Sequence, residues 1–350
     1  MREARQRGLT RGQLRSSAWD HPSHDLYGPA GSVASLPDLC RALRQVLPAG
    51  AAFSHLTLAR LLDVWLPPLP DWLPVQATLP PGAVRPERSG LWVARTRARL
   101  HRPIAVKGLP GVPVSVMIGQ LAEDLALLDL VVAVDCVLHR SWCTVGDIRE
   151  AIKSRQRGAP RLRAALDLVD GRSESPWETI LRLLLVLCGF ANAEPQRQIY
   201  GSTGRLIARG DIWLPGTRRL CEYDGEHHRD RTRHRLDLAR EKDLSRHGFE
   251  RYGYTKPEIV EAPYRIIRDA EDAYGLPHDP TRLSNWWPVF EESTLSASGW
   301  SRLLRRLHRF EGQGGRAPRN RELRADGGSA VTLSDHGPAI AVSGRSGGHR

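Results

Sequence analysis

The sequence predicts a mixed α/β protein of the α+β kind, with a mixed sheet flanked by helices in its C-terminal half and a mainly helical region before it. Residues 175–189 carry the start signal, apolar run and glycine stop of a helix, and residues 206–224 have the pattern of two strands joined by a tight turn. The chain has 350 residues, of which 41% are hydrophobic, which suits a globular protein of about two domains.

Composition and charge exclude several classes of protein. The five cysteines form no CxxC pair, which argues against a disulfide framework and against a cysteine zinc site. The most apolar stretch, residues 125–138, contains Asp129 and Asp135, and the first thirty residues lack the apolar core of a signal peptide. We therefore expect a cytoplasmic protein with no membrane partner. The net charge of +12 favours a polyanionic partner such as nucleic acid.

The N-terminal half is expected to be mainly helical. Thr10 is placed to cap a short helix that packs through Leu14, and the irregular prolines of residues 65–86 exclude a long helix there. Further helices are expected over Leu36–Leu47, Ser54–Val64, Leu121–Leu138 and residues 153–172, and a partly alternating strand over Leu91–Leu100.

Residues 173–260 contain the candidate functional residues, and this segment begins with a helix whose N-terminal capping residues are all present. Ser175 stands at the N-cap, Pro176 at the first helical position and Glu178 at the third, before an apolar run that stops at Gly189. Further along, the expected elements are a turn at Gly201–Gly204, strands over Leu206–Leu214 and Arg219–Asp224 with a tight turn between them, a basic helix over Arg229–Arg246 and a closing strand over Gly248–Tyr252.

The turn between the two strands fixes which residues face each other. A turn centred between Gly216 and Thr217 places Asp211 directly opposite Glu222, with their Cβ atoms roughly 5 Å apart. Asp224 lies two residues further along the strand and shares the same face. Three carboxylates on one face repel each other unless a cation lies between them. Mg²⁺ or Mn²⁺ suits such an oxygen-rich cluster, because these ions retain water and accept phosphate oxygens.

These motifs occur in an order that resembles a known family. The quoted elements are the Glu178 helix, the strand with Asp211, the run Glu222-Tyr223-Asp224-Gly225, the pair His227-His228, the helix with Asp237 and Arg240, and the strand Gly248–Tyr252. Together they resemble an endonuclease-domain family related to very-short-patch-repair (Vsr-like) endonucleases, within the PD-(D/E)xK restriction-endonuclease-like superfamily. The resemblance covers residues 173–256.

The resemblance implies a set of roles. Glu178, Asp211 and Glu222 would hold the metal ion. The superfamily lysine two residues after the motif glutamate is absent, and Asp224 occupies its place. Arg240 or Lys242, from the following helix, would then supply the positive charge that stabilises the transition state.

The residues themselves add one further candidate. His228, together with His227, is placed just past the metal face as a general base for water.

The N-terminal region resembles the winged-helix-like domain often joined to this endonuclease domain. The matching stretches are Gly8–Arg15, Phe53–His55, Ala59–Leu62 and Leu128–Val131. The expected organisation is a winged-helix-like DNA-binding region (1–70), a mixed α/β linker domain (71–172), the endonuclease domain (173–262), a helical extension (263–311) and a disordered Gly/Arg-rich tail (312–350).

Each candidate has a simpler interpretation. Glu178 completes a capping box, and Asp224 precedes a glycine and suits a turn. The histidines suit a solvated loop, and a zinc site from His227, His228 and His234 lacks regular spacing. The basic helix is either a solvated face or a phosphate contact. Trp286 and Trp287 indicate core packing rather than a base-stacking platform.

Three functions remain compatible with these features. The leading one is a metal-dependent endonuclease that hydrolyses phosphodiester bonds in DNA. The alternatives are a catalytically silent DNA-binding regulator of the antitoxin type, and a nuclease toxin that acts on RNA. The sequence leaves the oligomeric state open.

Overall fold

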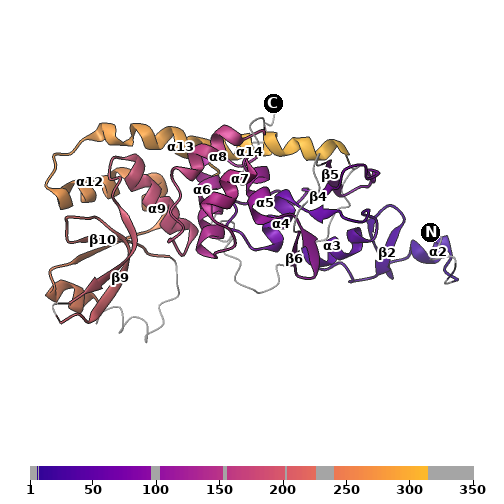
Figure 1. The fold of residues 1–350 in the computed structure, drawn as a ribbon, viewed down its shortest axis with the longest axis horizontal. Coiled ribbons are helices and arrows are strands. Elements are labelled where there is room, and N and C mark those ends of the chain that lie inside the picture. The colour runs from indigo at the N-terminus through magenta and orange to yellow at the C-terminus, as the bar shows by residue number, and fades with distance from the viewer. Residues whose placement is uncertain are drawn as a thin grey trace, which may run out of the picture.

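The computed structural model describes residues 6, 8–95, 103–152, 156–201, 203–225 and 240–313. These residues form a mixed α/β protein with a two-stranded, a five-stranded and a four-stranded sheet. The molecule is elongated, with the four-stranded sheet at one end, the five-stranded sheet toward the other and a helical layer between them (Figure 1).

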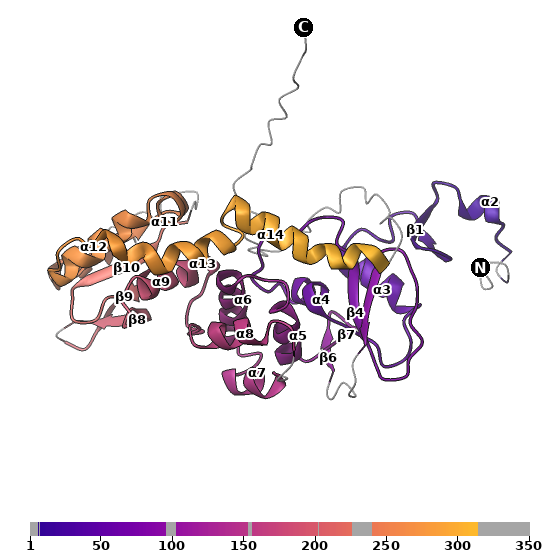
Figure 2. The same cartoon turned by 90° about the horizontal axis from the view of Figure 1, so that it is seen from above.

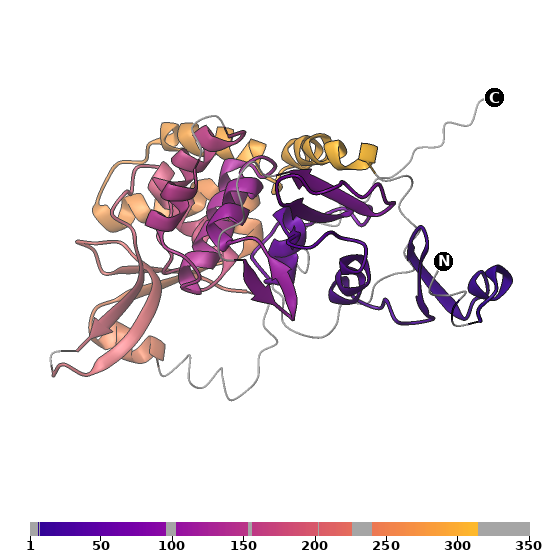
Figure 3. The ribbon, with the colours of Figure 1, turned by 45° about the vertical axis from the view of Figure 1, so that its right-hand side comes forward.

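The N-terminal residues form a small projecting unit. Helix α2 (Arg11–Leu14) is capped by Thr10, as predicted, and is followed by the antiparallel pair β1 (Trp19–Ser23) and β2 (Leu26–Pro29). In Figure 3 this unit lies at the end of the molecule opposite the four-stranded sheet.

The five-stranded sheet contains strands from both of the first two predicted regions, residues 1–70 and 71–172. Its order is β5-β4-β3-β7-β6, and β3 pairs with both β4 and β7. The elements are α3 (Leu36–Arg44), β3 (Ala52–Phe53), α4 (His55–Leu61), β4 (Val75–Leu79), β5 (Leu91–Arg95), β6 (Ile104–Val106) and β7 (Leu109–Gly111). The two predicted helices of this region are confirmed with shorter bounds. The winged-helix-like assignment stays a prediction.

The helical layer corrects one predicted element. It consists of α5 (Val114–Leu121), α6 (Leu127–His139), α7 (Val145–Ala151) and α8 (Ala159–Leu166). A single helix over Leu121–Leu138 is therefore wrong, because the chain turns through residues 122–126. The side chain of Asp124 in this turn is buried and accepts a bond from Arg309 Nη2 at 2.9 Å.

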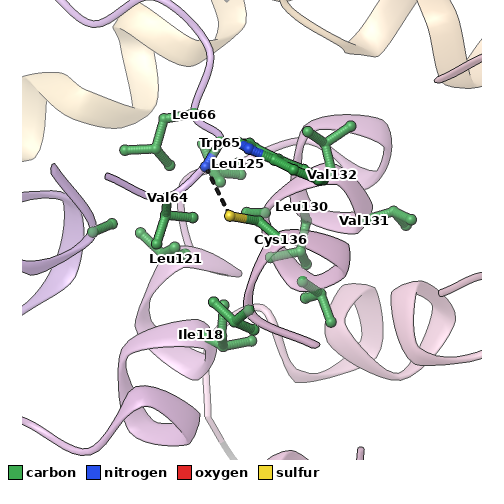
Figure 4. Close-up of a cluster of buried hydrophobic side chains, with 14 of the residues drawn as sticks. Val64, Trp65, Leu66, Ile118, Leu121, Leu125, Leu130, Val131, Val132 and Cys136 are labelled. Atoms are coloured by element: carbon green, nitrogen blue, oxygen red, sulfur yellow. Dashed lines mark hydrogen bonds between the residues drawn. The ribbon is translucent and has the colours of Figure 1, made fainter. Parts of the chain in front are cut away.

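Helix α6 is the centre of the core. Its residues 128–137 are all buried, which agrees with the apolar pattern around its whole circumference. Figure 4 shows Cys136 among buried aliphatic side chains, where its Sγ accepts a bond from the backbone N–H of Trp65 at 3.4 Å. The predicted helix over residues 153–172 is shorter in the structure, at Ala159–Leu166.

The C-terminal half contains the mixed sheet that the sequence predicts. Its strand order is β11-β10-β9-β8, with β10 and β11 parallel and the other pairs antiparallel. The elements are α9 (Pro176–Leu187), β8 (Glu194–Tyr200), β9 (Leu206–Trp213), β10 (Arg219–Tyr223) and β11 (Glu250–Tyr254), and residues 240–246 are helical. The sequence missed β8, because this edge strand is half exposed and polar and gives no alternating apolar signal.

The last described helices follow the four-stranded sheet in the sequence and lead back toward the N-terminal half of the molecule. They are α11 (Lys256–Glu261), α12 (Pro263–Tyr274), η1 (Pro280–Asn285), α13 (Trp286–Glu292), α14 (Ala297–Leu307) and η2 (His308–Gln313). We call α13, α14 and η2 the C-terminal arm. Figure 2 shows it running from the four-stranded sheet toward the five-stranded sheet.

Three contacts fix the C-terminal arm to the body. The Thr294 hydroxyl donates to Asp129 at 2.8 Å, Arg309 pairs with Asp124, and Phe310 packs edge-on against Trp92 with ring centroids 4.8 Å apart.

Two sequence predictions about this end of the chain can be compared with the structure. Trp286 is fully buried, as predicted, whereas Trp287 is 37% exposed and lies edge-on against Phe290. The expected disordered tail lies, from residue 314 onward, outside the described residues. In the part of the chain that the structure describes, no helix is long and apolar enough to cross a membrane.

Candidate active site

Helix α9 brings Glu178 to the edge of the four-stranded sheet. The Ser175 hydroxyl caps the helix by accepting the Glu178 N–H at 3.2 Å. The Glu178 Oε2 atom accepts the backbone N–H of Glu174 and the side-chain amide of Gln196, both at 2.8 Å. Burial of this side chain raises the pKa of Glu178. Ser175 is therefore the predicted cap, but the predicted capping box is not formed, because the Glu178 carboxylate binds the Glu174 N–H and Gln196 of β8 instead of the Ser175 N–H.

The position of α9 is set by a buried ion pair with the helical layer. Asp135 of α6 is fully buried, and its Oδ2 atom accepts bonds from Thr179 Oγ1 and Arg182 Nη2, each at 3.0 Å. Its Oδ1 atom accepts the backbone N–H groups of Asp170 and Gly171. Thr179 and Arg182 lie one and four residues after Glu178, so this ion pair holds the turn of α9 that carries the carboxylate.

The hairpin of β9 and β10 has the predicted register. Ile212 pairs with Cys221 and Trp213 with Leu220, and the next position along the same register places Asp211 opposite Glu222. The Asp211 Oδ2 atom accepts the backbone N–H of Tyr223 at 3.0 Å, which ties the carboxylate to the partner strand.

Three carboxylates converge at this point, and we call Glu178, Asp211 and Glu222 the acidic triad. The pKa of Asp211 is raised to about 7, first by burial and then by the negative charges of Glu178 and Glu222. A buried aspartate whose pKa is raised further by two neighbouring carboxylates marks a place where negative charge is concentrated.

Two arginines from different elements bind Glu222. Arg240 Nη2 lies 2.7 Å from Glu222 Oε1, and Arg251 Nε lies 2.5 Å from Glu222 Oε2. The Glu222 side chain is only 5% exposed, whereas the arginine side chains are 30% and 24% exposed. The two guanidinium groups therefore lie between the buried carboxylate and solvent.

Of the two predicted cations, the structure brings only Arg240 to the acidic triad. Lys242 lies two residues further along the same helical segment, with an exposed side chain. Arg251 was missed by the sequence analysis. An arginine within a predicted strand could have marked this position as functional. Its partner, Glu222, becomes visible only in the structure, where β10 and β11 pair in parallel.

Asp224 belongs to the rim of the site rather than to the acidic triad. Its side chain is 49% exposed, and its Oδ1 atom accepts a bond from Arg251 Nη2 at 3.0 Å. Its carboxylate also lies against Gly253, where an added Cβ would come within 1.8 Å of Oδ2. Arg251 thus bridges Asp224 and Glu222. The predicted histidines His227, His228 and His234 lie outside the described residues.

The donor chemistry of the acidic triad fits a hard divalent cation such as Mg²⁺ or Mn²⁺. The supporting observation is the raised pKa of Asp211, because a cation between the carboxylates would offset the repulsion from Glu178 and Glu222 that adds to the effect of burial. Across the described ranges, no three His, Cys, Asp or Glu side chains are arranged to hold a metal ion, and both oxygens of Glu222 bind arginine instead. A cation at this place would therefore share the Glu222 oxygens with the two guanidinium groups.

Further basic side chains surround the sheet. Arg209 binds Glu174 at 2.7 Å, Arg197 lies over the ring of Trp213, and Arg218 lies over the ring of Phe249. Arginines held over aromatic rings at a sheet surface are suited to contacting phosphates and bases.

Comparison of the chain with protein-family models, with curated proteins and with solved structures found no match. The interpretation of the site therefore rests on its own geometry and charge.

Proposed function

We propose that this chain is a Mg²⁺- or Mn²⁺-dependent endonuclease that hydrolyses phosphodiester bonds in DNA, built on a restriction-endonuclease-like core. The observation that carries the proposal is the convergence of Glu178, Asp211 and Glu222, where burial first and the two neighbouring carboxylates second raise the pKa of Asp211 to about 7. Clustered carboxylates beside basic side chains are one arrangement that can support phosphodiester hydrolysis with divalent ions.

The acidic triad would hold the cation, which when bound activates water and stabilises negative charge on the phosphate. The remaining work falls to the chain itself. Asp135 holds α9 in place, Gln196 orients Glu178, and Arg240 and Arg251 supply positive charge at the solvent side. Residues 1–70 are proposed as a winged-helix-like DNA-binding region. The role of His228 as general base stays a prediction.

A second function has one specific observation in its favour. Both oxygens of Glu222 are bound by arginine, so the carboxylate is already neutralised without a cation. This arrangement suits a catalytically silent nucleic-acid-binding regulator. RNA in place of DNA as the substrate remains an alternative for the nuclease.

The deciding experiment incubates supercoiled plasmid, and separately a structured RNA, with the full chain and Mg²⁺ or Mn²⁺. We expect cation-dependent cleavage of the plasmid, reduced at least roughly a hundredfold by Asp211→Asn while DNA binding persists. The matched control is Asp243→Asn, since Asp243 lies on the same helical segment as Arg240 and forms an exposed pair with Arg246. DNA binding without cleavage under either cation would establish the regulator, and cleavage of RNA alone would establish an RNA nuclease.

A further inference from the structure

The C-terminal arm covers a cluster of acidic side chains at the start of α6. Asp124 is 1% exposed, Asp129 is 2% exposed, and Glu123 precedes Asp124 in the turn between α5 and α6. The Thr294 N–H and hydroxyl both donate to Asp129, the hydroxyl at 2.8 Å. Arg309 donates to Glu123 at 2.5 Å and to Asp124 at 2.9 Å. Because Thr294 and Arg309 belong to the arm, detachment of the arm would expose the aspartate oxygens that they bind.

Other charges around the two aspartates come from the arm and from α8. Arg306 of α14 attracts both Asp124 and Asp129 electrostatically. Arg306 itself is repelled by Arg161 of α8 and attracted by Glu292 of α13. The aspartates therefore lie between a helical layer and an arm that both contribute arginines.

The hydrogen bonds of this cluster are incomplete. Among the described residues, Asp124 Oδ1 and the Nε atoms of Arg306 and Arg309 are buried without a hydrogen-bond partner. An ionised carboxylate with an unpartnered buried oxygen is unfavourable, and a proton on the carboxylate removes the charge. The docked arm therefore favours the protonated form of Asp124.

Burial is the largest influence on both aspartates. It raises the pKa of Asp124 and of Asp129 to about 6, although Arg309, Arg306 and Thr294 act in the opposite direction. With the arm detached, water would return their pKa values toward 3.8. The docked state thus binds protons more tightly than the detached state, so a fall in pH favours docking.

Two histidines lie at the end of the arm or against it. Burial lowers the pKa of His55, which packs against Phe310, to about 3, so this imidazole is neutral above pH 5. His308 stacks on Trp72, and its partner Glu311 lies on the same short helix η2. The His308–Glu311 pair therefore does not depend on docking of the arm.

We propose that docking of the C-terminal arm is linked to protonation of Asp124 and Asp129, so that the arm opens locally more often as the pH rises. The buried side chains of Leu303, Leu307 and Phe310 keep the arm docked in most molecules at every pH. Proton binding therefore changes the frequency of a rare local opening rather than the average structure. This inference concerns the arm alone and is independent of the proposed nuclease function.

The size of the effect follows from the difference between the docked and detached aspartates. Between pH 5 and pH 8 the docking constant should fall by up to about tenfold for each carboxylate, and by up to about a hundredfold for both. The fall is complete above about pH 7, where both carboxylates are ionised in either state.

The test measures hydrogen exchange of the backbone amides of α14 in the full chain at pH 5 and pH 8, corrected for the intrinsic exchange rate at each pH. We expect the protection of α14 to be about tenfold to a hundredfold lower at pH 8. Asp129→Asn should roughly halve this change on a logarithmic scale, because asparagine is neutral and its oxygen still accepts from Thr294. Glu291→Gln is the matched control, since Glu291 lies exposed on α13 of the same arm, and it should leave the change unaltered.

Several outcomes would overturn the proposal. Equal protection of α14 at both pH values would exclude proton linkage. Higher protection at pH 8 would show that the ion pair of Arg309 with ionised Asp124 outweighs burial. Protection of α14 equal to that of β10 at each pH would show that the arm opens only with the whole fold. If Asp129→Asn does not fold, Asp124→Asn and the wild-type comparison between pH 5 and pH 8 decide the question.

Discussion

Asp211→Asn should stabilise the folded protein in metal-free buffer, and the gain should depend on pH. The pKa of Asp211 is raised from 3.8 to about 7 by burial and by the charges of Glu178 and Glu222. Because the folded state has the higher pKa, ionisation of Asp211 destabilises the fold. This penalty is absent below the unfolded pKa, grows as the pH rises and is complete above about 7.

The size of the effect follows from the shift. About three pKa units correspond to about 4 kcal/mol above pH 7, and to less than half of that near pH 5. Asparagine removes the charge and retains an oxygen that accepts the Tyr223 N–H, so the hydrogen bond survives. Urea unfolding of wild type and variant, at pH 8.5 and pH 5 with a chelator present, measures the difference.

Glu222→Gln provides the contrasting control. It removes a charge from the same cluster but leaves Arg240 and Arg251 facing a neutral amide, so we expect destabilisation by about 1–3 kcal/mol. The reasoning is refuted if Asp211→Asn lowers the stability at pH 8.5, or if it changes the stability equally at both pH values.

Three further predictions concern other parts of the molecule. Glu178→Gln should keep the Ser175 cap and the thermal midpoint of unfolding but lower the cleavage rate at least roughly tenfold. Full cleavage activity of this variant would show that Glu178 has only a structural role. Asp135→Asn should lower the free energy of unfolding by about 3 kcal/mol, because it leaves the buried Arg182 without its carboxylate; unchanged urea unfolding would contradict this. Deleting residues 312–350 removes six arginines and three acidic residues, so the slope of log K against log salt for DNA binding should become shallower by about one to three units, and an unchanged slope would show that the tail makes no phosphate contacts.

The local parts of the site were predictable from the sequence. The tight turn over Pro215–Arg218 determines the register of β9 and β10, and this register alone places Asp211 opposite Glu222. The Ser175 cap likewise predicts where α9 begins. Both depend on interactions within about ten residues, for which residue preferences are strong.

The remaining parts depend on contacts between distant residues. Gln196 reaches Glu178 from a polar edge strand that gave no strand signal, and Arg251 reaches Glu222 only because β11 lies parallel to β10. Asp124, in the turn between α5 and α6, binds Arg309, which lies 185 residues further along the chain. No local pattern contains this information, because each contact is created by the assembled fold.

The C-terminal arm also determines when the fold can be completed during synthesis. Phe310 packs against Trp92 of the five-stranded sheet and Arg309 binds Asp124 between α5 and α6, so these contacts of the first 124 residues form only after residue 310 has been synthesised. Closure over such a separation is slow, because the ordering entropy is lost before the contacts form. On the ribosome, the N-terminal sheet therefore emerges long before the residues of the C-terminal arm that cover Trp92.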